Sequence, residues 1–127
     1  MKFVRESQAP KEFFEAPYKR NITHLIAPWT VGSRHVWMGI CEYPAGSVSN
    51  PHAHDDMDEA FYCIAGQGQI KVEDTVFYVT IGDAVYVEPG ETHQCINTKG
   101  SEPFKLVAVV TPPFTSQKFS EDHQAKR

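Results

Sequence analysis

Short runs of alternating hydrophobic and polar residues fill the middle of the chain. Eight runs rich in Val, Ile, Tyr, Phe and Thr are separated by Gly, Pro and Asp, at residues 21–27, 34–43, 59–66, 68–73, 76–81, 83–88, 93–97 and 104–111. A period of two residues is typical of β-strands, and many short strands at this spacing are typical of antiparallel sandwiches and barrels. Because no stretch keeps a helical period over three turns, the pattern predicts an all-β fold with few or no helices.

The two ends of the chain differ from this middle. Residues 1–20 are charged and contain prolines, so we expect an extended N-terminal arm. Residues 115–127, TSQKFSEDHQAKR, predict a polar, frayed C-terminal tail in which His123 is exposed. The β-barrel or sandwich domain is expected over 21–114, and a chain of 127 residues suits one such domain.

Composition excludes several classes of function. The net charge of −4 and the pI of about 5.8 give no basic surface for nucleic acid or for an anionic membrane. The longest apolar run, residues 104–114, is too short to span a bilayer, and the N-terminus lacks the apolar core of a signal peptide. The three cysteines are odd in number and lie in apolar runs. We therefore expect reduced thiols in a cytoplasmic protein.

A small group of residues has the spacing of metal ligands. His52 and His54 are two residues apart, so in a strand both side chains point to the same face. Glu59 opens the next hydrophobic run, and an antiparallel hairpin would bring it back beside the two histidines. His93 follows a Pro-Gly turn and can supply a third nitrogen. Three imidazoles and one carboxylate suit Fe, Ni, Cu or Zn.

The same residues resemble two motifs of the cupin superfamily. The first motif is similar to Gly46, His52, His54, Glu59 and Gly66, and the second to Gly82, Gly90, His93 and Asn97, with Glu88 in place of a proline. The resemblance covers about residues 35–111 and is to small single-domain cupins of the conserved-barrel (cupin 2) type. It implies a small double-sheet antiparallel β-barrel, or jelly roll. It also implies one divalent metal ion per chain (Fe, Mn, Ni or Zn), bound by His52, His54, Glu59 and His93.

Other residues are candidates for the wall of a substrate pocket. Phe61 and Cys63 share a face with Glu59, and Cys95 shares a face with His93; the alternative is that they only fill the core. His24 and Arg34 are further pocket candidates, Arg34 as a clamp for a carboxylate. The sequence leaves open whether Tyr43, Tyr86 and Arg20 also reach the pocket, and it assigns no catalytic residue beyond the metal ligands.

Three functions are compatible with such a site. The first is an Fe-dependent dioxygenase-type oxidoreductase acting on a small enolic, aromatic or keto-acid substrate. The second is an isomerase, lyase or decarboxylase that uses Mn, Ni or Zn as a Lewis acid on a sugar or hydroxy acid. The third is a non-enzymatic module that binds a small ligand. A homodimer is expected, because the apolar residues of the arm and the exposed sheet edges can be covered by a second copy.

Overall fold

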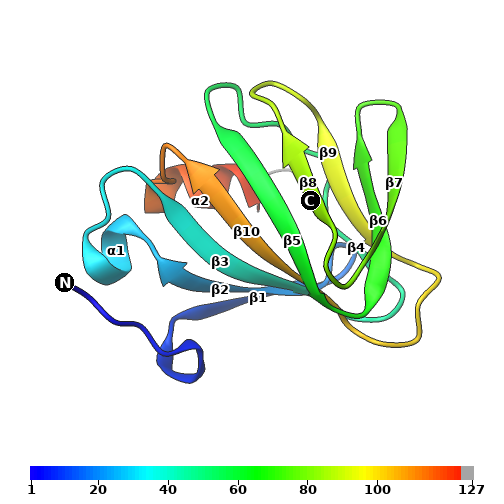
Figure 1. Ribbon diagram of the computed structural model, residues 1–127, viewed down its shortest axis with the longest axis horizontal. Coiled ribbons are helices and arrows are strands. Elements are labelled where there is room, and N and C mark those ends of the chain that lie inside the picture. Colours follow the sequence, from blue (N-terminus) through cyan, green and yellow to red (C-terminus); the bar gives the residue numbers. More distant parts are fainter. Residues whose placement is uncertain (124–127) are drawn as a thin grey trace.

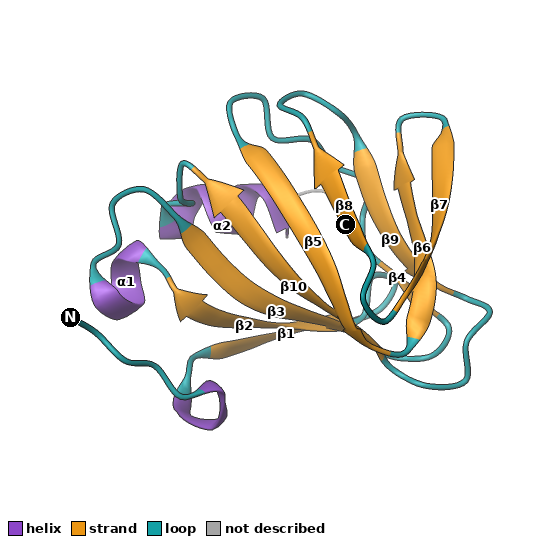
Figure 2. Ribbon diagram, in the orientation of Figure 1, coloured by secondary structure: helices purple, strands orange, loops and turns teal. Residues whose placement is uncertain are grey.

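Two antiparallel sheets pack against each other to form the body of the protein (Figures 1 and 2). The structure is a computed structural model, and it describes residues 1–123. The larger sheet has the order β1 (Lys11–Phe14), β2 (Arg20–Ile26), β3 (Trp37–Tyr43), β10 (Phe104–Thr111), β5 (Asp58–Ala65) and β8 (Ala84–Val87). The smaller sheet has the order β4 (Ser47–Val48), β9 (His93–Asn97), β6 (Gln67–Val72) and β7 (Thr75–Thr80).

The predicted all-β fold is confirmed. Each of the eight hydrophobic runs contains a strand whose ends lie within three residues of the predicted ones, and β9 and β10 begin and end where the pattern predicts. Two strands were not predicted, β1 and the two-residue β4. The helices are short: a 3-10 helix at Glu6–Gln8, α1 at Pro28–Val31 and α2 at Ser116–His123. Within residues 1–123, no helix has the length and apolar character needed to cross a membrane.

The core lies between the two sheets, because each strand turns its alternate apolar residues inward. In β10, the centre of the larger sheet, the even-numbered residues are fully buried: Phe104, Leu106, Ala108 and Val110. In β5, Glu59, Phe61 and Cys63 are buried, whereas Tyr62 and Ile64 point outward and are exposed. The period of two therefore places Glu59 of β5 inside the barrel, together with apolar residues.

Gly66 allows the chain to pass from the larger sheet to the smaller one. It lies between β5 and β6 and has a φ of +70°, a left-handed conformation that favours glycine. A Cβ at this position would lie 2.1 Å from the carbonyl oxygen of Pro103. Any larger residue here would therefore force apart the turn that joins the two sheets.

The C-terminal segment is ordered as far as the structure describes it. The prediction of a frayed tail was wrong for residues 116–123, which form α2; residues 124–127 lie outside the described residues. Phe119 of α2 is 1% exposed and packs against Phe14 and Trp37 of the larger sheet. Helix α2 lies beside β10 and β3 in Figure 1. The end of the segment expected to be an arm also joins the fold, because β1 pairs with residues 20–23 of β2.

Candidate metal centre

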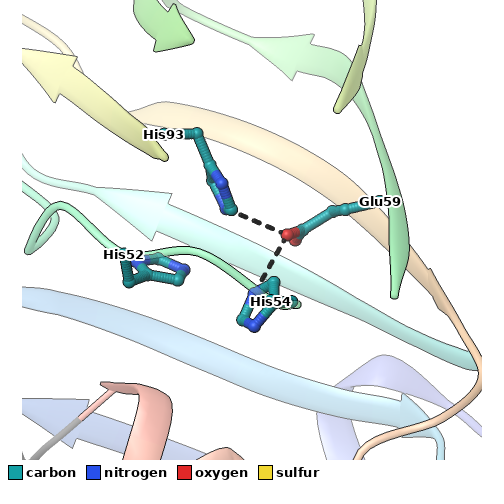
Figure 3. Close-up of side chains that lie close together, drawn as sticks. All are labelled: His52, His54, Glu59 and His93. Atoms are coloured by element: carbon teal, nitrogen blue, oxygen red, sulfur yellow. Dashed lines mark ion pairs between the residues drawn. The ribbon is translucent and has the colours of Figure 1, made fainter. Parts of the chain in front are cut away.

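Four side chains from separate parts of the chain meet inside the barrel (Figure 3). Glu59 is the second residue of β5, and His93 is the first residue of β9 in the other sheet. His52 lies in the loop between β4 and β5 and forms an isolated antiparallel bridge with His93. His54 follows two residues later in the same loop. All four are buried, with exposed fractions between 2% and 8%.

The route by which these residues meet differs from the predicted one. No hairpin pairs the histidine segment with β5; the backbone of His52 instead exchanges two hydrogen bonds with His93, of 3.1 and 2.9 Å. The amide of Gly90 donates a further hydrogen bond to the carbonyl of His54, at 2.9 Å. The loop is therefore attached to the smaller sheet, while Glu59 reaches the site from the larger one. The four predicted residues therefore do come together, but through a different strand partner from the predicted one.

The donor atoms of the four residues converge on one point. One atom from each lies within 4.8 Å of the others. Oε1 of Glu59 is 3.1 Å from Nε2 of His93 and 3.3 Å from Nε2 of His54. All three atoms are buried, and none has a hydrogen-bond partner within the described residues. Buried polar atoms without partners are costly, so their convergence on one point fits a site built for a cation.

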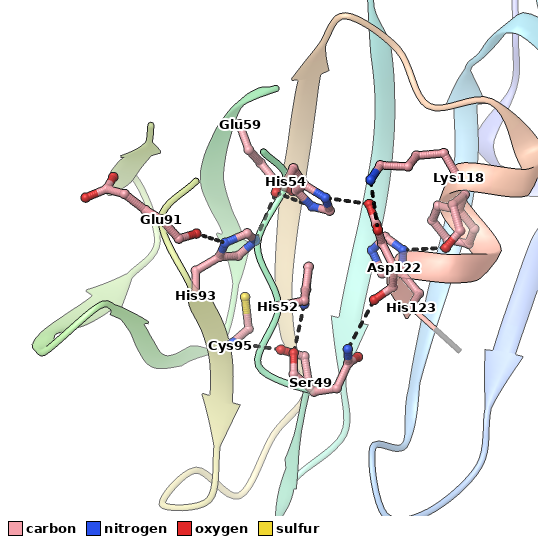
Figure 4. A network of polar contacts seen from close by, with 12 residues as sticks. Ser49, His52, His54, Glu59, Glu91, His93, Cys95, Lys118, Asp122 and His123 are labelled. Atoms are coloured by element: carbon pink, nitrogen blue, oxygen red, sulfur yellow. Dashed lines mark hydrogen bonds and ion pairs between the residues drawn. The ribbon is translucent and has the colours of Figure 1, made fainter. Parts of the chain in front are cut away.

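A hydrogen bond at Nδ1 orients each of the three imidazoles (Figure 4). Nδ1 of His52 donates to the carbonyl of Asn50 at 2.8 Å, and Nδ1 of His93 donates to the carbonyl of Glu91 at 3.1 Å. Nδ1 of His54 donates to Oδ2 of Asp122 at 2.7 Å. A proton held on Nδ1 leaves the lone pair on Nε2, the arrangement found in metal-binding histidines.

The charges in the site favour a cation as well. Burial by itself would raise the pKa of Glu59, but the imidazoles of His54 and His93 outweigh this effect and hold the pKa well below its ordinary value. Burial, together with the neighbouring imidazoles, lowers the pKa of His52 well below its usual range. Glu59 is therefore an anion and His52 is neutral at neutral pH, as metal binding requires of these two residues. Burial lowers the pKa of His93, but the adjacent Glu59 carboxylate outweighs this effect and raises it, so a metal ion would have to displace a proton shared between these two residues.

The donor set fits a single divalent ion. Two nitrogens that each lie about 2.1 Å from one ion are at most about 4.2 Å apart, so the observed spacing needs a shift of only about half an ångström. Imidazole nitrogens with one carboxylate suit Fe, Mn, Ni or Zn, and the residues that would bind the ion are His52, His54, Glu59 and His93. This set is the one predicted from the sequence.

Aromatic side chains surround the candidate ligands. The ring of Phe114 lies 5.2 Å from that of His54, and the ring of Phe61 lies 6.0 Å from that of His93. The ring centroid of His123 in α2 lies 5.0 Å from that of His52, and it stacks on the ring of Phe119 with 4.2 Å between centroids. Aromatic rings therefore lie beside the site, and α2 covers one side of it.

The predicted pocket residues are placed at different distances from this site. Phe61 lies beside it, and Cys95 is buried two residues beyond His93 on the same face of β9. Cys63 is buried on the same face of β5 as Glu59, but four residues along the strand, a distance of about 13 Å. Its thiol points to the carbonyl of Ala65, at 3.5 Å. The structure leaves the pocket role of these residues as a prediction.

The other candidates lie mostly outside the cluster. His24 is buried, with Nδ1 accepting from the indole of Trp37 at 3.1 Å and Nε2 3.4 Å from a carboxylate oxygen of Glu12. Arg34 is exposed in the loop before β3. Tyr86 is 60% exposed on β8, where its hydroxyl donates to Asp58, whereas Tyr43 is buried.

Arg20, for which the sequence left open whether it reaches the pocket, lies inside the protein. Its guanidinium donates to Oδ1 of Asn50 at 2.9 Å and to the carbonyl of His123 at 3.1 Å, and it lies over the ring of Phe14. These contacts tie β2 to the metal-binding loop and to the last residue described in α2.

Sequence reasoning missed two residues beside the site, Asp122 and His123. His123 was expected to be exposed in the tail, but it is 7% exposed and its Nδ1 bonds the carbonyl of Phe119 at 2.8 Å. One signal was present in the sequence: Phe119, Asp122 and His123 have the i, i+3, i+4 spacing of one helical face. In a short polar segment this spacing is too weak to predict a docked helix.

Comparison with known proteins places this site in a family. The Cupin_2 family model, described as the cupin domain, matches residues 39–110. The chain is 30% identical over 74 residues to uncharacterized protein MJ1618 of Methanocaldococcus jannaschii, a match that covers 58% of this chain and 58% of that protein. It is 26% identical over 88 residues to tetracenomycin polyketide synthase protein TcmJ of Streptomyces glaucescens, covering 69% of this chain and 58% of that protein.

The chain thus matches a little over half the length of each of these relatives. Among solved structures, a predicted oxalate decarboxylase from Thermotoga maritima superposes with a TM-score of 0.77 at 22% identity, over 87% of this chain and 98% of that one. This likeness shows a shared fold. The family match covers more than half of the chain and includes all four candidate ligands, and the chain therefore belongs to the Cupin_2 family of cupin domains.

Proposed function

We propose that the protein is an iron-dependent, dioxygenase-type oxidoreductase acting on a small enolic, aromatic or keto-acid substrate. The observation that carries the proposal is a buried set of three imidazoles and one carboxylate whose donor atoms converge, with the rings of Phe61 and Phe114 beside it. A bound Fe(II) would supply oxygen activation and open coordination positions for a substrate with adjacent oxygens.

The residues around the site suit such a substrate. Glu59 is the one acidic residue among the four ligands, so a dication would keep a net charge of about +1 and attract an enolate or carboxylate oxygen. Phe61 and Phe114 offer apolar walls against which a flat ring or a short acyl chain can pack. Their burial also keeps water away from the reacting atoms, which oxygen chemistry requires.

The similarity to TcmJ supports the substrate class. That relative is named as a polyketide synthase protein, and neighbouring carbonyl or enol oxygens, as in a polyketide, are hard donors of the kind that bind a divalent metal. At 26% identity the similarity supports this chemical class and no particular compound.

One observation favours Lewis-acid chemistry as a second candidate function. An isomerase, lyase or decarboxylase needs an acid or base beside the metal, and His123 lies 5.0 Å from His52 without belonging to the donor set. The likeness to a predicted oxalate decarboxylase points the same way. However, burial lowers the pKa of His123 to about 3, which makes its imidazole a weak base at neutral pH. We therefore rank this function second.

The test begins with untagged protein purified without oxygen or chelator, and with its metal content measured by mass spectrometry. Portions of metal-free protein are then loaded with Fe, Mn, Ni or Zn and offered catechols, 1,3-diketones and 2-keto acids, while oxygen uptake is recorded. We expect uptake with the iron form and at least one of these classes, and none with a Glu59→Ala variant. His35→Ala is the matched control, because His35 is exposed in the loop before β3.

The outcomes separate the candidate functions. A fully loaded iron form that consumes no oxygen with any of these compounds would overturn the proposal. Turnover of sugar acids or oxalate by the Mn, Ni or Zn form, followed by NMR, would support the Lewis-acid function instead. Ligand binding without turnover by any metal form would leave a binding module.

We also propose that the protein acts as a homodimer in the cytoplasm. Phe3 and Phe13 of the N-terminal segment are 80% and 69% exposed, and a second copy could cover them. The three cysteines are free and buried, which suits a reducing compartment. Light scattering at micromolar concentration should give twice the chain mass of 14.3 kDa; a monomer would contradict the proposal.

A further inference from the structure

Helix α2 supplies the only side-chain acceptor among the three hydrogen bonds that orient the imidazoles. We propose that Asp122 is a positioning residue of the metal centre, which holds His54 in the orientation that aims its Nε2 at the ion, and that α2 is therefore part of the site. The inference rests on the metal site of the proposed function, but not on the reaction that the site performs.

The contact has the geometry of a strong charged hydrogen bond. Nδ1 of His54 lies 2.7 Å from Oδ2 of Asp122, and the two side chains are 1% and 5% exposed. His52 and His93 donate to backbone carbonyls instead, at 2.8 and 3.1 Å. A carboxylate acceptor is stronger than a carbonyl and makes the imidazole a better electron donor to a metal. His54 is thus the ligand whose affinity for metal depends on another side chain.

The helix itself gives only a weak reason for this carboxylate. Lys118, its partner within α2, precedes it by four residues, and this is the less favourable order for such a pair. Asp122 is also 4% exposed, and burying a carboxylate costs free energy unless partners compensate. Its partners are His54 on one oxygen and Lys118 on the other, at 3.3 Å. The position of Asp122 makes physical sense as support for His54.

The surrounding contacts hold Asp122 against the metal-binding loop (Figure 4). The side-chain amide of Asn50 donates to the carbonyl of Asp122 at 3.2 Å, while the carbonyl of the same Asn50 accepts from Nδ1 of His52. Arg20 donates both to the Asn50 side chain and to the carbonyl of His123. The supports of two ligands, His52 and His54, are therefore connected through Asn50 and α2.

The docking of α2 has a second, separate cause, which makes the proposal testable. Phe119 is 1% exposed and lies within 6.3 Å, between ring centroids, of five aromatic side chains: Phe14, His24, Trp37, Phe114 and His123. Because this packing does not involve the Asp122 side chain, removing the carboxylate should leave α2 in place. The effect on the metal can then be measured on a folded protein.

The experiment compares Asp122→Ala and Asp122→Asn with Glu121→Ala. Glu121 is the adjacent acidic residue, but it is exposed, and its carboxylate accepts a hydrogen bond from Gln117 one turn earlier in α2. Co²⁺ is the probe, with its affinity measured by competition against a chelator and its ligand field read from the visible spectrum. We expect Asp122→Ala to weaken Co²⁺ binding about 10- to 100-fold and to change the spectrum, because outer partners of ligands have effects of this size.

Asp122→Asn keeps an acceptor oxygen without the charge, so we expect a smaller loss, and Glu121→Ala should bind as the wild type does. Thermal unfolding of the metal-free proteins checks that α2 remains docked; if Asp122→Ala does not fold, the Asp122→Asn variant carries the test. Wild-type affinity and an unchanged spectrum in the folded Asp122 variant would overturn the proposal, as would an equal loss in Glu121→Ala. Neither readout involves oxygen or substrate, so normal Co²⁺ binding together with absent oxygen uptake would defeat the proposed function alone.

Discussion

Replacing His93 with alanine removes one of four metal donors and leaves most of the surrounding structure in place. The backbone of His93 pairs with that of His52 through two hydrogen bonds, and these do not involve the imidazole. The lost atom, Nε2, is buried and has no hydrogen-bond partner within the described residues. We therefore expect the variant to fold, and to bind metal through the three donors that remain.

The expected size of the effect follows from the role of this atom. Losing an outer partner of a ligand costs about 10- to 100-fold in metal affinity, so losing the ligand itself should cost at least about 100-fold. At a free metal concentration of 100 times the wild-type Kd, binding stabilises the wild type by about 2.7 kcal/mol. A 100-fold weaker site gains only about 0.4 kcal/mol under the same conditions. For a chain of 127 residues, these values correspond to shifts in Tm of about 10 °C and about 1.5 °C.

Differential scanning calorimetry with and without Zn²⁺ or Co²⁺ measures these two shifts directly. The quantity to compare is the shift that metal produces in each protein, because the mutation can also change the Tm of the metal-free form. His35→Ala is the control and should show the full wild-type shift, since His35 is an exposed histidine outside the donor set. A metal-induced shift as large in His93→Ala as in the wild type would refute the reasoning and remove His93 from the ligand set.

Three further predictions test the packing and protonation of the interior. Phe119→Ala should lower the free energy of unfolding by about 3 kcal/mol in urea titrations, because the ring is fully buried among aromatic neighbours; a loss below about 1 kcal/mol would show that α2 is not docked. Burial raises the pKa of the Cys41 thiol to about 12, and Cys63 and Cys95 are buried too. We therefore expect no thiol to react with a disulfide reagent at pH 8 until the protein unfolds. Fast labelling of the native protein would contradict this prediction. Burial lowers the pKa of His123 to about 3, whereas a histidine in the unfolded chain has a pKa near 6.5. Between these two pH values the unfolded state binds one more proton than the folded state. The free energy of unfolding therefore falls as the pH drops below about 6.5, by up to about 1.4 kcal/mol per pH unit. In the metal-free protein, His123→Phe should therefore flatten the decline in unfolding free energy between pH 7 and 5, and an unchanged slope would show that His123 is not buried in its neutral form.

The sequence by itself determined the positions of the strands and the four candidate metal ligands. Strand positions could be predicted because burial of one face imposes a local period of two, and β9 and β10 were found to the residue. The candidate ligands could be named because an imidazole pair, a carboxylate and a third imidazole at these spacings are the donors that a divalent metal ion prefers. The first inference depends on the alternation of neighbouring residues and the second on two short motifs, and both can be recognised in a single sequence.

The tertiary structure alone decided which strands pair across the site. The segment carrying His52 and His54 pairs with β9, some 40 residues later, and not with the neighbouring β5. The period of the side chains is the same for either partner, so the pattern cannot distinguish a local hairpin from a distant pairing. The pattern also cannot tell which arginine is buried. Arg20 is buried beside Asn50 and Arg34 is exposed, although each lies at the start of a hydrophobic run.

Only the tertiary structure also placed α2 beside the candidate metal centre. A helix of eight mostly polar residues is marginal in water, so its sequence predicts a frayed tail. The helix is stable because Phe119 finds an aromatic cluster in the larger sheet, and Asp122 finds His54 in a loop 68 residues away in sequence. The free energy that orders this segment comes from contacts with distant parts of the chain, and the local sequence pattern cannot predict these contacts.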